Sequence, residues 1–257
     1  MDIIWLASYP RSGNTWLRSL IYHYLHGTPT STADIENAIP NLHRMIHQNK
    51  RFDETNNKQF LCKSHYCISS HHLYLNNTVG FIYILRHPKD VLISAINYFQ
   101  FTQNNPLDEI GFCERFIKNM GVARWQAIGI GTWVEHITKW MNASTQYPHL
   151  FLCYEDMLKN PEAALTSVVQ FLGQPIDNRR INESVSACKP DKLRQMEMNE
   201  KKLGLENSLF VGSYNAAQQG HTFVNQCVSG QKLSHIATHL DAKFDKRFSS
   251  VLKLFGY

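Results

Sequence analysis

The chain has 257 residues, of which 43% are hydrophobic, so it is long enough to bury a sizeable core. Because α/β folds of this length commonly form one domain, we expect a single domain over residues 1–257. The formal net charge of +5 is mild, and no basic run points to nucleic acid, although the sign favours anionic ligands. No basic leader and no apolar run of about 18 residues occur, which predicts a cytoplasmic protein without stable membrane insertion.

The first predicted elements are a strand, a turn and a helix. The apolar residues 3–7 predict a buried strand, and SYPRSGNTW (residues 8–16) leads directly into a helical pattern. Backbone N–H groups at a helix start lack intrahelical acceptors and carry the positive end of the dipole, so this turn predicts a phosphate-like ligand. It differs from the triphosphate loop G-x-x-x-x-G-K-S/T, because Ser8 and Asn14 stand at the first Gly and the Lys.

The rest of the chain alternates strand and helix patterns. Three further apolar runs predict buried parallel strands over residues 59–62, 79–85 and 150–153. Helices are predicted over residues 14–26, from Pro88, and from Pro161 after an Asn160 cap. This order predicts an α/β fold of three layers, with a central parallel sheet, helices on both faces and a P-loop-like nucleotide site at the carboxyl ends of the strands.

Polar residues follow the predicted strands at that edge. Lys63 and His65 follow the second strand, Arg86 follows the third, and Tyr154 follows the fourth. Two cations and an imidazole beside an anion-binding loop suit group transfer to a nucleophile that loses a proton. Ser94, two helical turns beyond Arg86, can join it in holding a second phosphate.

These segments together resemble the cytosolic-type sulfotransferases. SYPRSGNTW resembles their phosphosulfate-binding loop, KSH their Lys-Thr-His segment, and FIYILRHPKDVLISAINYF their 3′-phosphate segment. The likeness continues in the family's order to the terminal Phe-Gly-Tyr. It implies 3′-phosphoadenosine 5′-phosphosulfate (PAPS) as donor, 3′-phosphoadenosine 5′-phosphate (PAP) as product, and no metal. The sulfuryl group would pass to a hydroxyl or amine of a small molecule.

The resemblance also implies residue roles. His65 takes the place of the general base, Lys63 that of a cation near the sulfuryl oxygens, and Arg11 that of a loop Lys beside the bridging oxygen. A positive charge there stabilises the negative charge that grows on the departing phosphate, although a guanidinium cannot donate a proton to it. The implied donor-binding residues are Arg11, Ser12, Gly13, Asn14, Thr15 and Trp16 in the loop, Arg86 and Ser94 at the 3′-phosphate, and Tyr154 at the adenine.

Two segments depart from the family pattern. Asn225 and Gln226 stand where the family has an Arg-Lys-Gly run on the 3′-phosphate, and neither carries charge. We therefore expect a weaker hold on that phosphate, or a different residue that supplies the charge. The family's adenine-binding Ser-Phe patch is not recognisable near residues 188–190.

Two other functions stay open at this point. A PAP-binding module without turnover is compatible with Arg11 and with the uncharged Asn225 and Gln226. A small-molecule kinase would need a carboxylate for Mg²⁺ at a strand end, and Asp156 alone stands there.

The remaining histidines and aromatic residues divide into core, surface and acceptor site. Trp133, His136 and Trp140 have helical spacing and predict core packing, whereas the pairs His43/His47 and His235/His239 predict helix surface. The six cysteines form no C-x-x-C pair, which predicts reduced thiols and no metal site. Aromatic residues in segments expected to cover the site predict an apolar or ring-bearing acceptor. They are Tyr66, Tyr98, Phe99, Phe101, Phe112, Trp125 and Tyr214. No motif distinguishes a monomer from a homodimer.

Overall fold

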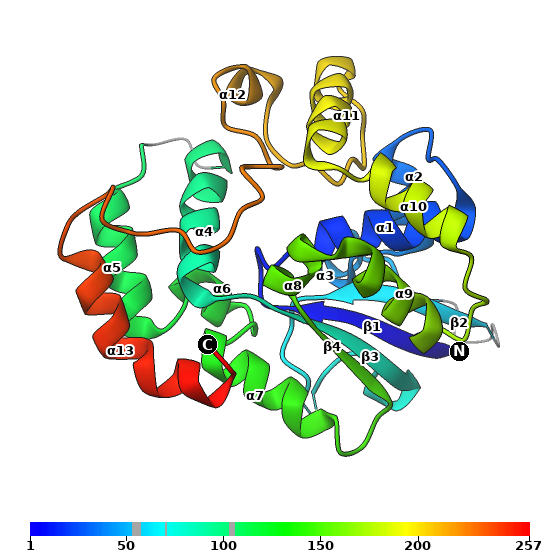
Figure 1. The fold of residues 1–257 in the computed structure, drawn as a ribbon, viewed down its shortest axis with the longest axis horizontal. Coiled ribbons are helices and arrows are strands. Elements are labelled where there is room, and N and C mark those ends of the chain that lie inside the picture. Colours follow the sequence, from blue (N-terminus) through cyan, green and yellow to red (C-terminus); the bar gives the residue numbers. More distant parts are fainter. Residues whose placement is uncertain (53–57, 70, 103–105) are drawn as a thin grey trace.

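The computed structural model describes residues 1–52, 58–69, 71–102 and 106–257. Its centre is a sheet of four parallel strands in the order β2-β1-β3-β4 (Figure 1). The strands are β1 (Asp2–Ser8), β2 (Gln59–Ser64), β3 (Thr78–Leu85) and β4 (His149–Cys153). The predicted parallel sheet is confirmed. Strand β2 is longer than predicted, so Lys63 lies within the strand rather than after it.

Helices surround the sheet. Those on the first half of the chain are α1 (Asn14–His26), α2 (Thr32–Ala38), α3 (Leu42–His47), the 3₁₀ turn η1 (Leu75–Asn77), α4 (Pro88–Thr102), α5 (Glu109–Asn119) and α6 (Ala123–Ala127). The second half forms α7 (Trp133–Ala143), α8 (Tyr154–Lys159), α9 (Pro161–Phe171), α10 (Asn178–Ala187), α11 (Pro190–Leu203), α12 (Tyr214–Gln218) and α13 (Leu240–Leu254).

Each face of the sheet packs against its own layer of helices. Leu6 and Ile82 point to one face, where they share a buried cluster with side chains of α1, α8 and α9. Trp5 and Tyr83, which alternate with them along the strands, join the cluster of α4, α5, α7 and α13 on the other face. Strands β1 and β3 are buried on both faces, which explains their continuous apolar runs. Strand β4 was also predicted to be buried, but His149 and Phe151 are exposed, so that part of the prediction is wrong. The predicted three-layer α/β architecture is confirmed.

Local signals in the sequence place the helix ends. Helix α1 starts after Gly13 and stops at Gly27, and both glycines have positive φ. The side chain of Asn160 accepts a hydrogen bond from the N–H of Ala163 (3.0 Å), and Pro161 opens α9. These helices begin where the sequence predicts.

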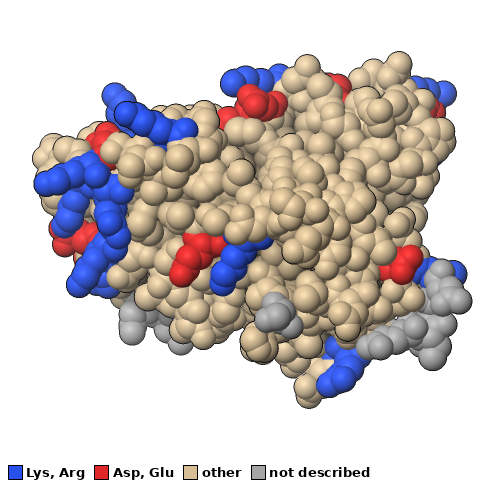
Figure 2. Space-filling model, turned by 90° about the horizontal axis from the view of Figure 1, so that it is seen from below, with Lys and Arg blue, Asp and Glu red and all other residues tan. Residues whose placement is uncertain are grey.

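One end of the molecule carries a cluster of exposed charges. Figure 2 shows Lys and Arg side chains gathered at the end of the molecule occupied by α5 and α13, with acidic side chains among them. Lys243 of α13 pairs there with Glu114 of α5 (2.7 Å). His235 and His239, predicted on a helix surface, are exposed but precede α13, so the helical part of that prediction is wrong. Within the described ranges, no helix is long and apolar enough to cross a membrane.

Candidate active site

A cavity of about 450 Å³ is formed by the loop after β1, the ends of β2 and β3, and the helices α4 and α8. The segment that follows α11 also contributes to its wall. The cavity brings together almost all residues that the sequence singles out as a site. Its lining includes Arg11, Gly13, Asn14, Thr15, Trp16, Lys63, His65, Arg86, Ser94 and Tyr154. Ser12 is buried in the same loop without lining the cavity.

The loop between β1 and α1 is shaped by Gly13 and Asn14. Gly13 has φ +98°, and a Cβ atom there would lie 2.6 Å from the ring of Tyr154, so only glycine fits without displacing that ring. The side-chain amide of Asn14 donates to the carbonyl of Leu6 (2.8 Å) and to the hydroxyl of Ser8 (3.3 Å). Asn14 therefore ties the loop to the strand before it, at the position where triphosphate loops place Lys.

Several buried polar atoms, in the loop between β1 and α1 and just after β3, have no hydrogen-bond partner within the described part of the chain. They include Ser12 Oγ and Arg86 Nε. Leaving a buried polar group unpaired costs about 1–3 kcal/mol, so a native site usually offers such groups to a ligand. Both atoms are hydrogen-bond donors, and phosphate oxygens would satisfy them. The site therefore fits an anionic ligand that accepts hydrogen bonds from the loop and from Arg86.

The guanidinium of Arg11 is directed toward helix α4. Its Nε donates to the hydroxyl of Ser94 (3.1 Å), and its Nη2 donates to the carbonyl of Phe223 (3.1 Å). The guanidinium also lies over two aromatic rings, with its Cζ 4.6 Å from the ring centroid of Phe223 and 5.2 Å from that of Tyr98. Burial lowers the pKa of Arg11 to about 10, which leaves it charged at neutral pH. The structure thus joins Arg11 to Ser94, two residues that the sequence assigns to separate phosphate subsites.

Arg86 fastens the loop to the C-terminal part of the chain. Its Nη1 donates to the carbonyl of Arg11 (2.8 Å), and its Nη2 donates to the carbonyl of Val228 (3.0 Å). The guanidinium stacks on the ring of Tyr154 at 4.2 Å. The ring of Trp16 also lies edge-on to the ring of Tyr154, with the two ring centroids 6.1 Å apart. Two aromatic rings therefore stand next to the anion-binding groups.

His65 is held in one tautomer. Its Nδ1 lies 2.7 Å from the carbonyl oxygen of Ser8. Because a carbonyl only accepts, Nδ1 carries the hydrogen and Nε2 keeps a free lone pair. Burial and the charge of Lys63 hold the pKa of His65 well below its usual value, so the ring is neutral at pH 7. An imidazole in this state can accept a proton at Nε2.

His136 supports His65 from the core. Its Nε2 donates to the carbonyl of His65 (3.0 Å), and its Nδ1 accepts from the hydroxyl of Tyr83 (2.8 Å). Burial lowers the pKa of His136 to about 3, which keeps the ring neutral. Trp133, His136 and Trp140 are all buried, which confirms their prediction as core residues. Sequence reasoning missed the contact with His65, because nothing in the spacing shows which strand end faces α7.

Lys63 places a positive charge in the cavity wall. Its side chain is 9% exposed. Burial and repulsion by Arg18 lower the pKa of Lys63 to about 7, whereas Glu36 acts in the opposite sense. Glu36 is itself hydrogen-bonded to Arg18 (2.8 Å), so it compensates the charge of Lys63 only in part.

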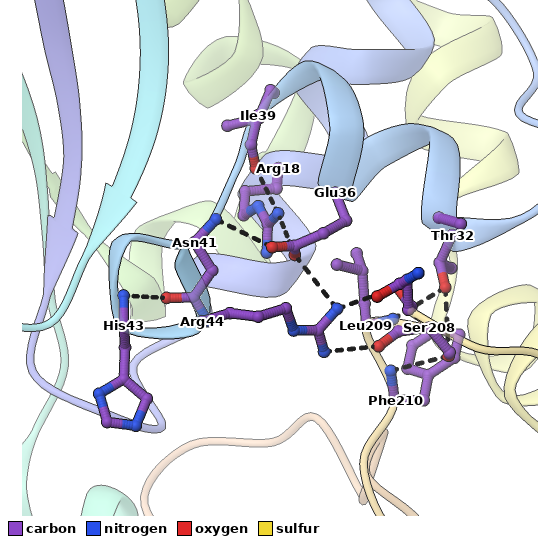
Figure 3. A network of polar contacts seen from close by, with 12 residues as sticks. Arg18, Thr32, Glu36, Ile39, Asn41, His43, Arg44, Ser208, Leu209 and Phe210 are labelled. Atoms are coloured by element: carbon purple, nitrogen blue, oxygen red, sulfur yellow. Dashed lines mark hydrogen bonds and ion pairs between the residues drawn. The ribbon is translucent and has the colours of Figure 1, made fainter. Parts of the chain in front are cut away.

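A polar network joins α2 and α3 to the segment between α11 and α12 (Figure 3). Glu36 lies between Arg18 (2.8 Å) and Arg44 (3.7 Å). Arg44 also donates to the carbonyls of Asn207 (3.0 Å) and Ser208 (2.8 Å). The segment held in this way adds two apolar side chains to the cavity, Leu209 and Val211.

The predicted acceptor-site aromatics separate into two groups. Tyr66, Tyr98 and Trp125 line the cavity. Phe99 is 3% exposed and belongs to the hydrophobic core, so its prediction as an acceptor-site residue is wrong. Phe101, Phe112 and Tyr214 are likewise absent from the cavity lining. The apolar lining residues that sequence reasoning missed include Ile128, Ile130, Leu193, Leu209 and Val211.

His43 and His47 lie on α3, where His47 is exposed and His43 half-buried, which confirms their prediction as helix surface; both also line the cavity. Their rings are 4.4 Å apart on α3, and His43 Nδ1 lies 2.8 Å from the hydroxyl of Tyr66. Spacing alone puts both on one face of a helix but does not reveal that this face closes a cavity. Across the described ranges, no group of three or more His, Cys, Asp or Glu side chains is positioned to hold a metal ion.

The two segments that depart from the sulfotransferase pattern both reach the cavity. Asn225, Gln226 and Cys227 line it, and Cys227 has φ +55°. Cys188 and Pro190 line it as well. Both segments therefore form walls of the site.

The chain matches known sulfotransferases over nearly its whole length. A family model described as the sulfotransferase domain matches residues 1–256. The chain is 23% identical to the amine sulfotransferase of Oryctolagus cuniculus, covering 99% of this chain and 82% of that protein. It is 24% identical to sulfotransferase 1E1 of Cavia porcellus, over 98% of this chain and 83% of that protein.

Solved structures share the fold. A retinol dehydratase in complex with androsterone and PAP aligns with a TM-score of 0.72 at 17% identity, covering 98% of this chain and 80% of that one. A mouse sulfotransferase complexed with PAP aligns with a TM-score of 0.69 at 20% identity, covering 98% of this chain and 84% of that one. With the family match over residues 1–256, the chain belongs to the sulfotransferase domain family.

Proposed function

We propose that this chain transfers the sulfuryl group of PAPS to a hydroxyl or amine on a small, apolar or aromatic molecule. The observation that carries the proposal is the hydrogen bond from His65 Nδ1 to Ser8, which leaves a neutral Nε2 as proton acceptor. Family membership supports sulfuryl transfer as the reaction class.

In this proposal the donor lies along the loop and α4. The N–H groups and hydroxyls of Ser12 to Thr15 hold the 5′-phosphosulfate, and Arg86 with Ser94 holds the 3′-phosphate. Trp16 and Tyr154 flank the adenine. The unpartnered Ser12 Oγ and Arg86 Nε support this assignment. When bound, the donor supplies an activated sulfuryl group.

The chain's own groups handle the proton and the charges. His65 accepts the acceptor's proton at Nε2 and is reset by releasing it to solvent. Lys63 stabilises negative charge near the base, and Arg11 stabilises it on the loop side. Arg11 acts through charge alone, because its pKa of about 10 keeps it protonated at neutral pH.

The acceptor occupies the part of the cavity walled by Tyr66, Tyr98 and Trp125. These rings and the aliphatic residues beside them favour a ring-bearing or apolar molecule and exclude water. The relative named amine sulfotransferase supports an amine among the acceptor groups. We further propose that residues 1–257 act as one domain in the cytoplasm, as a monomer or homodimer.

The two alternatives have less support. The kinase reading needs Asp156 at the site, but Asp156 is absent from the cavity lining and pairs with Lys159 (3.1 Å). A PAP-binding module without turnover would not need a His65 ring whose Nε2 can accept a proton.

Calorimetry and product analysis together test the donor. We expect PAP to bind without added metal, and ATP with Mg²⁺ to compete poorly. Incubation with PAPS and a panel of phenols, alcohols and amines should yield a sulfated product by mass spectrometry. ATP-dependent phosphorylation of any panel member would support the kinase, whereas tight PAP binding without product would support the module.

A further inference from the structure

The segment over residues 223–228 forms a wall of the cavity without a charged side chain of its own. Two of its backbone carbonyls bind arginine side chains: the carbonyl of Phe223 accepts a hydrogen bond from Arg11, and the carbonyl of Val228 accepts one from Arg86. Asn225 and Gln226 line the cavity but are neutral. A phosphate monoester carries close to two negative charges near neutral pH, so a cation from elsewhere would strengthen its binding here.

Helix α11 holds this segment in place. The carboxylate of Glu197 is fully buried and accepts from the N–H groups of Phe223 (2.7 Å) and Val224 (2.9 Å). Lys201, one turn along the helix, pairs with the same carboxylate (2.5 Å). The segment is therefore packed against the face of α11 that carries Glu197.

Arg194, three residues before Glu197, lies on that same face of α11. Its Nη1 donates to the carbonyl of Asn225 (2.9 Å). That partner is neutral, so the hydrogen bond positions the guanidinium without compensating its charge. An arginine has five N–H donors, which leaves others for a second ligand.

Cys227 marks where these charges meet. Burial raises the pKa of the Cys227 thiol, whereas the positive charges of Arg194, Arg86 and Arg11 each act to lower it. The geometry agrees, because the three guanidiniums donate to backbone carbonyls of this one segment: Arg11 to Phe223, Arg194 to Asn225 and Arg86 to Val228. Three positive charges held by one short segment favour an anion at this side of the cavity.

We propose that Arg194 supplies the positive charge that Asn225 and Gln226 lack, and that it binds the 3′-phosphate of the donor together with Arg86. The inference rests on the proposed function, since it concerns the same donor. It differs from a purely structural role, because a residue that only held the segment would affect every nucleotide alike.

Two ligands that differ by one phosphate test the proposal. PAP and adenosine 5′-monophosphate share the adenosine and the 5′-phosphate, and only PAP carries the 3′-phosphate. We expect Arg194→Gln to weaken PAP binding about tenfold in calorimetry and to leave the monophosphate unchanged. Arg194→Lys, which keeps the charge, should retain part of the preference for PAP. Lys192→Gln removes an exposed charge from the same helix and should change neither affinity.

Several outcomes would overturn the assignment. If Arg194→Gln weakens both ligands equally, or weakens neither, then Arg194 does not bind the 3′-phosphate. If Arg194→Lys loses the preference as fully as the Gln variant does, the hydrogen bond to Asn225 is what matters. A wild-type protein that binds no PAP would contradict the proposed function itself, whereas an intact preference in Arg194→Gln would contradict only this inference.

Discussion

Lys63 and His65, two residues apart at the end of β2, are bases whose pKa values are both lowered, with different consequences. The lowered pKa of His65 keeps its Nε2 free to accept a proton at neutral pH. The lowered pKa of Lys63, about 7, means that its positive charge is complete only below that pH. Burial in one cavity wall thus keeps the His65 ring unprotonated while reducing its basicity, and it limits the charge of Lys63.

The pH dependence of kcat/KM for PAPS tests whether the charge of Lys63 contributes to the reaction. Lys63 is charged below about pH 7 and neutral above it, so kcat/KM for PAPS should fall as the pH rises through about 7. Lys63→Arg stays protonated throughout and should flatten that fall. Steady-state kinetics over this range measure the effect. An unchanged profile in Lys63→Arg would show that another group titrates.

The residue scale is also where sequence reasoning was incomplete. Strand ends and the loop pattern predicted which side chains meet in the cavity. They did not predict that Arg11 donates to Ser94, or that His136 holds the carbonyl of His65. Such contacts depend on side-chain directions that only the packed structure fixes.

At the scale of elements, the loop between β1 and α1 depends on glycine for two separate reasons. Gly13 has a positive φ and faces the ring of Tyr154, whereas Gly27 at the other end of α1 has a positive φ and open space around it. Substitutions at the two positions therefore distinguish the effect of backbone strain from the effect of a clash with Tyr154.

We expect Gly13→Ala to abolish or strongly weaken PAP binding, because its methyl group would push Tyr154 and distort the loop. Gly27→Ala carries larger backbone strain, since Gly27 has φ +85° and ψ −158°, and should cost about 1–3 kcal/mol of stability while PAP binding persists. Calorimetry with thermal unfolding of both variants measures the difference. Equal PAP affinity in the two variants would contradict a loop shaped for this ligand.

Elements were the most predictable part of this chain. The strands are short, mostly apolar runs, of which β1 and β3 are buried on both faces, and α1 and α9 carry their own start signals, so local sequence suffices. The pair at His235 and His239 was misplaced because histidine spacing is compatible with a helix but does not require one.

At the scale of the whole molecule, the cavity depends on contacts between distant parts of the chain. Glu200 of α11 accepts from the N–H and the hydroxyl of Thr32 (2.5 Å each) and from the hydroxyl of Ser208 (2.6 Å). Arg44 holds the carbonyl of Ser208 from α3. The pairings of Glu200 with Thr32 and of Arg44 with Ser208 join residues more than 150 positions apart, so local patterns cannot predict them.

We expect Glu200→Gln to loosen the segment over residues 205–213, because an amide cannot accept all of these hydrogen bonds with the strength of a carboxylate. The acceptor KM should rise several-fold while PAP affinity stays the same. Hydrogen exchange of that segment should increase, and Glu206→Gln, an exposed change in the same segment, should leave it unaltered. Unchanged exchange in Glu200→Gln would show that this network does not hold the cavity wall.

The central claim is sulfuryl transfer from PAPS with His65 as the base, and a single-turnover assay with labelled PAPS tests it most directly. His65→Ala should keep its PAP affinity and lose roughly 100- to 10,000-fold in transfer rate, the range for a general base. His235→Ala, which removes an exposed histidine, should transfer normally. Transfer at the wild-type rate by His65→Ala, or no transfer by the wild type to any hydroxyl or amine, would contradict the claim.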